Sequence, residues 1–248
     1  MGSAAVLLAR AAHTASRSGL FTMSYTTAYF LCIAALIFSV ICSIGVKTTF
    51  NKYSKRASMG EITGAEAARR ILDANGLTHI RIEHISGNLT DHYDPRSDVI
   101  ALSDGVYGST SLAAIGVAAH ECGHAVQHAQ GYIPIKIRTA IVPLVNFGST
   151  TYIYIFLLGI LFNFGLLVNI GIALFAFVVL FQLVTLPVEF NASFRAMKTL
   201  KSMNILGASE LPAAGKTLRA AAMTYVASLA VSFTQLLRLM ASARSRRR

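Results

Sequence analysis

The sequence predicts a mainly α-helical membrane protein, in which about four apolar helices accompany one small α+β domain. Composition, long apolar runs and a single polar stretch lead to this fold class. Of the 248 residues, 54% are hydrophobic and 13% are charged, whereas about a quarter of the residues in a soluble domain are charged. The mean hydropathy of +0.56 also places the chain in the membrane class.

The net charge of +11 comes largely from basic clusters that flank apolar runs, at residues 47–56 and 244–248. Such clusters are typical of the ends of membrane spans. We do not expect nucleic acid as a partner, because no recognition module accompanies the charge. Cys32, Cys42 and Cys122 form no disulfide framework.

Residues 1–22 form an N-terminal extension, and no acidic residue precedes Glu61. Arg10 and Arg17 lie there among Ala, Ser and Thr, a composition that is typical of transit peptides. The alternative is a disordered tail that precedes a functional start at Met23. The sequence leaves both interpretations open.

Three apolar segments follow along the chain. Residues 23–46 are long enough for one span, and the basic residues after them predict a cytoplasmic end. Residues 150–186 exceed one span of about 20 residues, so we expect a helical hairpin that turns at residues 163–165 or at Asn169. Residues 220–248 hold a softer apolar helix and a basic tail. This helix either spans, which places the tail outside against the positive-inside rule, or packs on the other helices.

Residues 47–149 have a mixed composition and predict the α+β domain. Thr63 and Glu66 form a capping-box pattern at the start of a helix. The expected elements are a helix at 64–75, a strand at 77–85, a turn region at 88–95, a strand at 99–102 and an Ala-rich helix at 111–130. We expect the strand at 99–102 to be an edge strand, where Ile100 would help to hold an extended peptide by main-chain pairing.

The Ala-rich helix contains the HExxH pattern His120-Glu121-Cys122-Gly123-His124. Residues four apart share a helix face, with β-carbons about 5–6 Å apart, so both imidazoles can reach one zinc ion at about 2.0–2.1 Å. Glu121 lies about 100° around the helix, where it can act as the general base of a hydrolytic reaction. Cys122 points away. The alternative is a surface helix with two unrelated histidines.

A catalytic zinc needs a third protein ligand, and the sequence offers three candidates. His128 lies about 12 Å along the helix from His120, which favours a supporting or substrate-side role. His92 is the second candidate, but the interpretation of His92 as a turn residue without a metal-binding role is equally favoured. Glu189 follows the hairpin, which returns the chain to the side of His120; the alternative is a carboxylate paired with Arg195. Donors for an oxyanion could be Tyr132, His128 or Arg195.

Four segments together resemble the YugP-type family of neutral zinc metallopeptidases. They are Phe50–Lys55, Thr90–Arg96, HECGHAVQHAQGY and LPVEFNAS, and the resemblance covers about residues 23–240. The organisation is also similar to HtpX-like membrane peptidases and to the CAAX prenyl peptidases. The resemblance implies a zincin-like catalytic domain that binds one zinc ion.

In those relatives, a helix after the hairpin supplies a glutamate ligand from a Glu-x-x-Ala-Asp pattern. Glu189 and Ala192 match this pattern, which implies that Glu189, on a helix within residues 187–219, is the third ligand. Ser193 departs from it, because the relatives carry an Asp that orients a ligand histidine. Asp104 or Asp94 could take over that role.

We therefore expect a membrane-embedded zinc endopeptidase that acts on protein or peptide substrates. The protein would be a multi-pass protein of the cell membrane, in contact with the lipid bilayer, with a cytoplasmic catalytic domain. A non-enzymatic, zinc-stabilised adaptor or chaperone is the main alternative, and it would have no use for Glu121. A channel or transporter is disfavoured, because the spans carry almost no ionisable groups.

Overall fold

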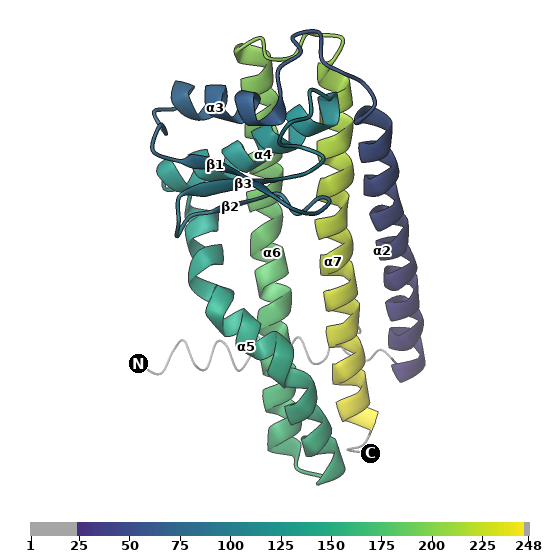
Figure 1. Ribbon diagram of the computed structural model, residues 1–248. Coiled ribbons are helices and arrows are strands. Elements are labelled where there is room, and N and C mark those ends of the chain that lie inside the picture. Colours follow the sequence, from purple (N-terminus) through teal and green to yellow (C-terminus); the bar gives the residue numbers. More distant parts are fainter. Residues whose placement is uncertain (1–23, 246–248) are drawn as a thin grey trace, which may run out of the picture. The chain divides into compact units, whose positions relative to one another are not determined.

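The computed structural model describes residues 24–245, so the predicted extension at 1–22 lies outside the described residues. Helices dominate, with one three-stranded sheet, and the predicted fold class is confirmed (Figure 1). The elements are α2 (Tyr25–Tyr53), α3 (Gly64–Ala74), β1 (Arg81–Ile85), β2 (His92–Asp94), β3 (Val99–Ser103), α4 (Leu112–Ala129), α5 (Ile133–Leu161), α6 (Gly165–Ser202) and α7 (Leu211–Ser245).

Helices α2, α5, α6 and α7 are each long and apolar enough to cross a membrane. Many of their large apolar side chains are exposed, among them Phe30, Ile41, Leu157 and Phe177. Exposed apolar surface on this scale suits contact with lipid chains rather than with water. The chain is therefore a membrane protein.

Helices α5 and α7 both begin earlier than their apolar segments suggest. Helix α5 starts at Ile133, inside the stretch predicted as polar domain, and α7 starts at Leu211. Lys136 and Arg138 lower the hydropathy of the first turns of α5, but they do not interrupt a helix. Pro134 lies in its first turn, where the missing N–H costs no hydrogen bond.

A tight turn joins α5 to α6 at the first of the two predicted positions, with Asn163 in the left-handed region at φ 53°. The two helices pack closely near this turn. A β-carbon on Gly159 would lie 2.6 Å from the backbone nitrogen of Val168, and one on Gly171 would lie 2.8 Å from Cβ of Phe156. Glycine permits this approach, as is common between membrane helices.

The described chain forms two compact units. One contains residues 38–144 and 180–229, and the other contains 24–37, 145–179 and 230–245. The first unit holds the sheet, α3 and α4, and it contains every residue of the candidate site. Helix α3 begins with the predicted capping box, in which Glu66 accepts from the Thr63 backbone N–H at 2.8 Å.

The strand order in the sheet is β1-β3-β2, with β1 parallel and β2 antiparallel to β3. Two predictions are therefore wrong. The turn region at 88–95 contains β2, which is too short to show an alternating pattern. The strand at Val99 is central rather than an edge strand, so the main chain at Ile100 cannot pair with a peptide; its continuous apolar run suits a strand buried on both faces. Strand β2 is the edge of the sheet on the side of the site.

Helices α4 and α6 touch through their backbones at Gly123. A β-carbon there would lie 2.7 Å from the backbone oxygen of Ala192, and Ala192 is fully buried. Gly123 lies between His120 and His124, and Ala192 lies one turn after Glu189. The α4–α6 contact therefore brings the residues of the sequence motif next to those of the LPVEFNAS segment.

We expect Gly123→Ala to destabilise the protein by about 1–3 kcal/mol, because the added methyl group collides with backbone. This loss exceeds the gain of about 1 kcal/mol that alanine brings to a helix. Gly116→Ala is the matched control on the same helix, since its β-carbon meets the side chain of Ala214 at 3.3 Å. Chemical denaturation in detergent compares the two variants. A Gly123→Ala variant as stable as Gly116→Ala would contradict the α4–α6 contact.

Candidate metal centre

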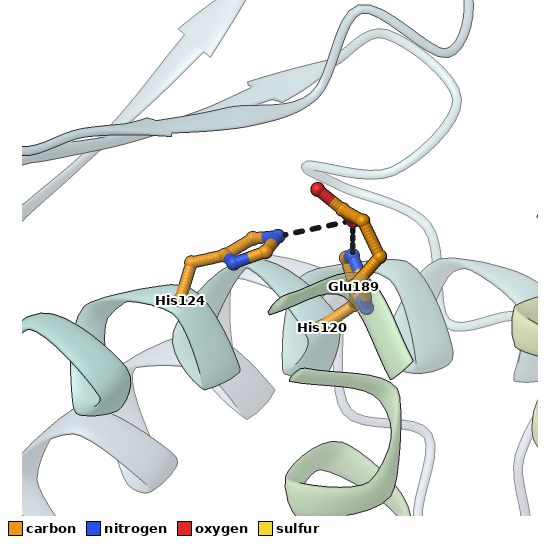
Figure 2. Close-up of side chains that lie close together, drawn as sticks. All are labelled: His120, His124 and Glu189. Atoms are coloured by element: carbon orange, nitrogen blue, oxygen red, sulfur yellow. Dashed lines mark hydrogen bonds and ion pairs between the residues drawn. The ribbon is translucent and has the colours of Figure 1, made fainter. Parts of the chain in front are cut away.

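Helix α4 presents two imidazoles to one carboxylate on α6. Nε2 of His120 lies 3.2 Å from Oε2 of Glu189, and Nε2 of His124 lies 3.4 Å from the same oxygen (Figure 2). All three ligand atoms lie within 4.8 Å of one another. Donors of a tetrahedral zinc ion at about 2.0–2.1 Å lie about 3.3 Å apart. The arrangement therefore fits a zinc ion held by these three side chains.

The burial of Glu189 also indicates a cation. Its side chain is 2% exposed, and its nearest basic partner besides the histidines is Arg138, with Nη1 3.6 Å from Oε1. A buried carboxylate needs a paired charge or a metal. Burial opposes the charged form of His124, but the hydrogen bond and negative charge of Glu189 raise the pKa of His124 overall. The site thus favours positive charge at the point where the three ligand atoms meet.

Gln127 orients His124 and fixes which of its nitrogens is free. The amide Nε2 of Gln127 donates to the backbone oxygen of Val188 at 2.8 Å, so its Oε1 faces Nδ1 of His124 at 3.0 Å. An amide oxygen only accepts, and Nδ1 must therefore carry the proton. This leaves the lone pair on Nε2, the atom that faces Glu189, as a metal ligand requires. Gln127 is absent from the residues predicted for the site, because its full burial does not show in the sequence.

Ser193 lies beside the other imidazole, with its Oγ 3.2 Å from Nδ1 of His120. The two aspartates proposed for this role lie elsewhere, and that prediction is wrong. Asp104 accepts from the backbone N–H of Gly87 and pairs with His84. Asp94 accepts from the backbone N–H of Arg96 within its own turn. The position that departs from the family pattern therefore still contacts the histidine, through a hydroxyl group.

Glu121 is 7% exposed and lines a cavity next to the three ligand atoms. Cys122 is buried away from the site, with Sγ 3.6 Å from the backbone oxygen of Ala68, and burial raises the pKa of its thiol. The thiol therefore stays protonated and takes no part in the cluster. The arrangement leaves a carboxylate free beside the three candidate ligands.

The cavity beside Glu121 has a volume of about 270 Å³, and the edge strand β2 forms one of its walls. His92 lies on this wall but outside the ligand cluster. The rings of Tyr93 and His128 pack edge to face at 5.8 Å. Burial and Asp98 raise the pKa of Tyr93 to about 12, and burial with the nearby His124 and Arg138 lowers that of His128. Both rings are therefore neutral at pH 7.

The three predicted oxyanion donors are dispersed. His128 lines the cavity. Arg195 lies in a separate cavity, where its Nε donates to Oδ1 of Asn191 at 2.7 Å. Tyr132 lies under the Arg195 guanidinium, 6.0 Å from ring centre to Cζ. Arg195 and Tyr132 therefore do not line the cavity beside Glu121.

Two residues outside the predicted set line the cavity instead. Arg138 comes from α5 and Tyr225 comes from α7. Nothing in their local sequence distinguishes them, because only the packing of α5 and α7 brings them to the site.

We expect Gln127→Met to lower zinc affinity by about 10–100-fold, the usual cost of losing a residue that orients a ligand. The variant keeps the volume of the side chain but frees Nδ1 of His124. Gln130→Met is the control, because Gln130 pairs with Arg195 and contacts no candidate ligand. Competition with a fluorescent chelator measures the affinity. Equal affinities for the two variants would mean that Gln127 does not orient a ligand.

Comparison with known proteins agrees with the geometry. The family model described as "Putative neutral zinc metallopeptidase" matches residues 28–244. The chain is 48% identical over 211 residues to the "Putative membrane protease YugP" of Bacillus subtilis (strain 168), which covers 85% of this chain and 94% of that protein. No solved structure matches the chain significantly. The chain belongs to the family of neutral zinc metallopeptidases, as the resemblance implied.

Proposed function

We propose that the protein is a zinc-dependent endopeptidase that works in the membrane, with Glu121 as its general base. One observation carries this proposal: a buried carboxylate lines the cavity beside a cluster of two imidazoles and a second carboxylate, yet it is not part of that cluster. A purely structural zinc site fills its fourth position with a protein ligand. The described residues offer three ligands and a free base instead.

His120, His124 and Glu189 would hold the ion. Zinc, when bound, supplies Lewis acidity that lowers the pKa of water towards about 7 and polarises a carbonyl group. Glu121 takes a proton from the attacking water while the water oxygen bonds to the peptide carbonyl carbon. Glu121 then gives that proton to the amine nitrogen as the carbon–nitrogen bond breaks. The cavity shields this transfer from bulk water, because the carboxylate is almost fully buried.

Negative charge develops on the carbonyl oxygen during the attack and needs donors. His128, Arg138 and Tyr225 all line the cavity and carry N–H or O–H groups. Arg138 already lies near the far oxygen of Glu189, so its charge acts on the same small region. We assign the stabilising role to these three side chains rather than to Tyr132 and Arg195.

The alternative function, a zinc-stabilised adaptor or chaperone, explains less. It gives no reason for a buried Glu121 that faces a cavity instead of a partner. A structural role would also favour a closed zinc site with four protein ligands. The nearest thiol, that of Cys122, cannot be the fourth ligand, because it points towards Ala68. The peptidase accounts for both observations.

We infer that the four long helices cross the membrane and that α3, α4 and the sheet lie on its cytoplasmic side. The basic residues at the end of α2 support this orientation, and α7 runs unbroken from Leu211 to Ser245. A reporter inserted at Gly60 should therefore face the cytoplasm, and one fused after Arg248 should face the other side. Both reporters on one side would mean that α7 does not cross.

The decisive test of the activity pairs zinc content with cleavage. Glu121→Gln should keep its zinc and lose about 10²–10⁴-fold in kcat, the usual contribution of a general base. Glu189→Gln should lose the zinc itself. Glu83→Gln, on the exposed strand β1, is the control and should change neither. Protein purified in detergent is analysed by metal emission spectroscopy and by cleavage of a model protein. Cleavage by Glu121→Gln at the wild-type rate would refute the proposal.

A further inference from the structure

A second cavity, of about 210 Å³, adjoins the metal centre. It shares five lining residues with the first cavity, namely Asp91, His120, Glu121, Glu189 and Tyr225. The two cavities therefore meet at the candidate base and ligands. A peptide whose scissile bond lies at Glu121 has neighbouring residues that can enter both of them.

The two cavities differ in chemistry. The first has Arg96, Arg138 and His128 in its walls. Among the described residues that line the second, there is no lysine or arginine, and apart from the shared residues, Ser193 and Thr224 the walls are apolar: Val46, Leu89, Val117, Leu218, Ala221 and Ala222. Desolvation of a charged or strongly polar group in such a cavity would be unfavourable. The part of the second cavity that lies away from the shared carboxylates therefore suits an apolar group.

The rim of this cavity carries an unusual leucine. Leu89 has a left-handed backbone at φ 56°, a conformation that favours glycine and asparagine over leucine. Its side chain is nevertheless 40% exposed, so burial within the protein does not compensate for the strain. A bound apolar group would cover this side chain, and strained residues of this kind cluster at ligand sites.

The volume sets the size of the group. An apolar cavity of about 150 Å³ holds benzene, so a cavity of about 210 Å³ can hold a leucine or phenylalanine side chain. Two small residues, Ala221 and Ala222 on α7, leave this space open. Leu218, one turn earlier on the same helix, is almost fully buried and closes one side of it.

We propose that the second cavity is a specificity subsite that receives one apolar side chain of the substrate, from a residue next to the scissile bond. This inference rests on the proposed peptidase function and names the substrate class: peptides with a medium-sized or large apolar residue beside the cleaved bond. The walls of the cavity come from α2, α4 and α7. The side chains at positions 221 and 218 determine which size of substrate side chain is preferred.

The test uses peptides that differ at one position, with Ala, Leu, Phe or Asp on either side of the cleaved bond. Cleavage by the full-length wild type gives kcat/KM, and binding to zinc-loaded Glu121→Gln gives an affinity that is independent of turnover. Ala221→Leu fills the cavity and should shift the preference by about tenfold from Phe towards Ala. Leu218→Ala enlarges it and should shift the preference in the opposite direction. Met223→Leu, on the same helix but lining neither cavity, should match the wild type.

Opposite shifts at one and the same peptide position, seen in binding, would establish the subsite. Unchanged preferences in both Ala221→Leu and Leu218→Ala, or binding of the Asp peptide as tight as that of the Leu peptide, would overturn it. A protein that binds peptides with these size preferences but cleaves none would contradict the proposed function and leave the subsite standing.

Discussion

The backbone contact between α4 and α6 at Gly123 is the constraint on which the site depends. With no side chain at Gly123, the carbonyl of Ala192 comes within van der Waals reach of the helix that carries His120 and His124. Glu189, one turn earlier on α6, then meets both imidazoles. A larger residue at this point would collide with the backbone of α6, and a zinc ion tolerates variation of only about 0.2 Å in its ligand distances.

The same contact satisfies the polar groups that hold the ligands in place. Gln127 on α4 donates to Val188 and Asn191 on α6, while its oxygen faces His124. Ser193 on α6 approaches His120 on α4. Each imidazole is thus oriented through its Nδ1 by a group of the α4–α6 interface, and each turns its Nε2 towards Glu189. Packing and chemistry share one interface, so a change that loosens the helices also disturbs the ligands.

The sequence predicted those features that depend on local geometry. The spacing of His120 and His124 follows from one helical turn, and the four apolar helices follow from hydropathy. The prediction of Glu189 as the third ligand depended on the return of the chain through the hairpin and on the resemblance to a family. Gln127 carries no mark until its burial is known, and Arg138 and Tyr225 depend on how α5 and α7 pack. The strand order was not predictable either, because three residues in β2 are too few to show an alternating pattern, and without β2 the strand β3 would lie at the edge of the sheet.

The central claim is that two imidazoles and one carboxylate hold a zinc ion between α4 and α6. X-ray absorption at the zinc edge of the purified protein tests it most directly. We expect two imidazole ligands with oxygen in the remaining positions, and a clear change of this spectrum, or loss of the metal, in Glu189→Gln. A sulfur ligand from a cysteine such as Cys122, or an unchanged spectrum in Glu189→Gln, would contradict it.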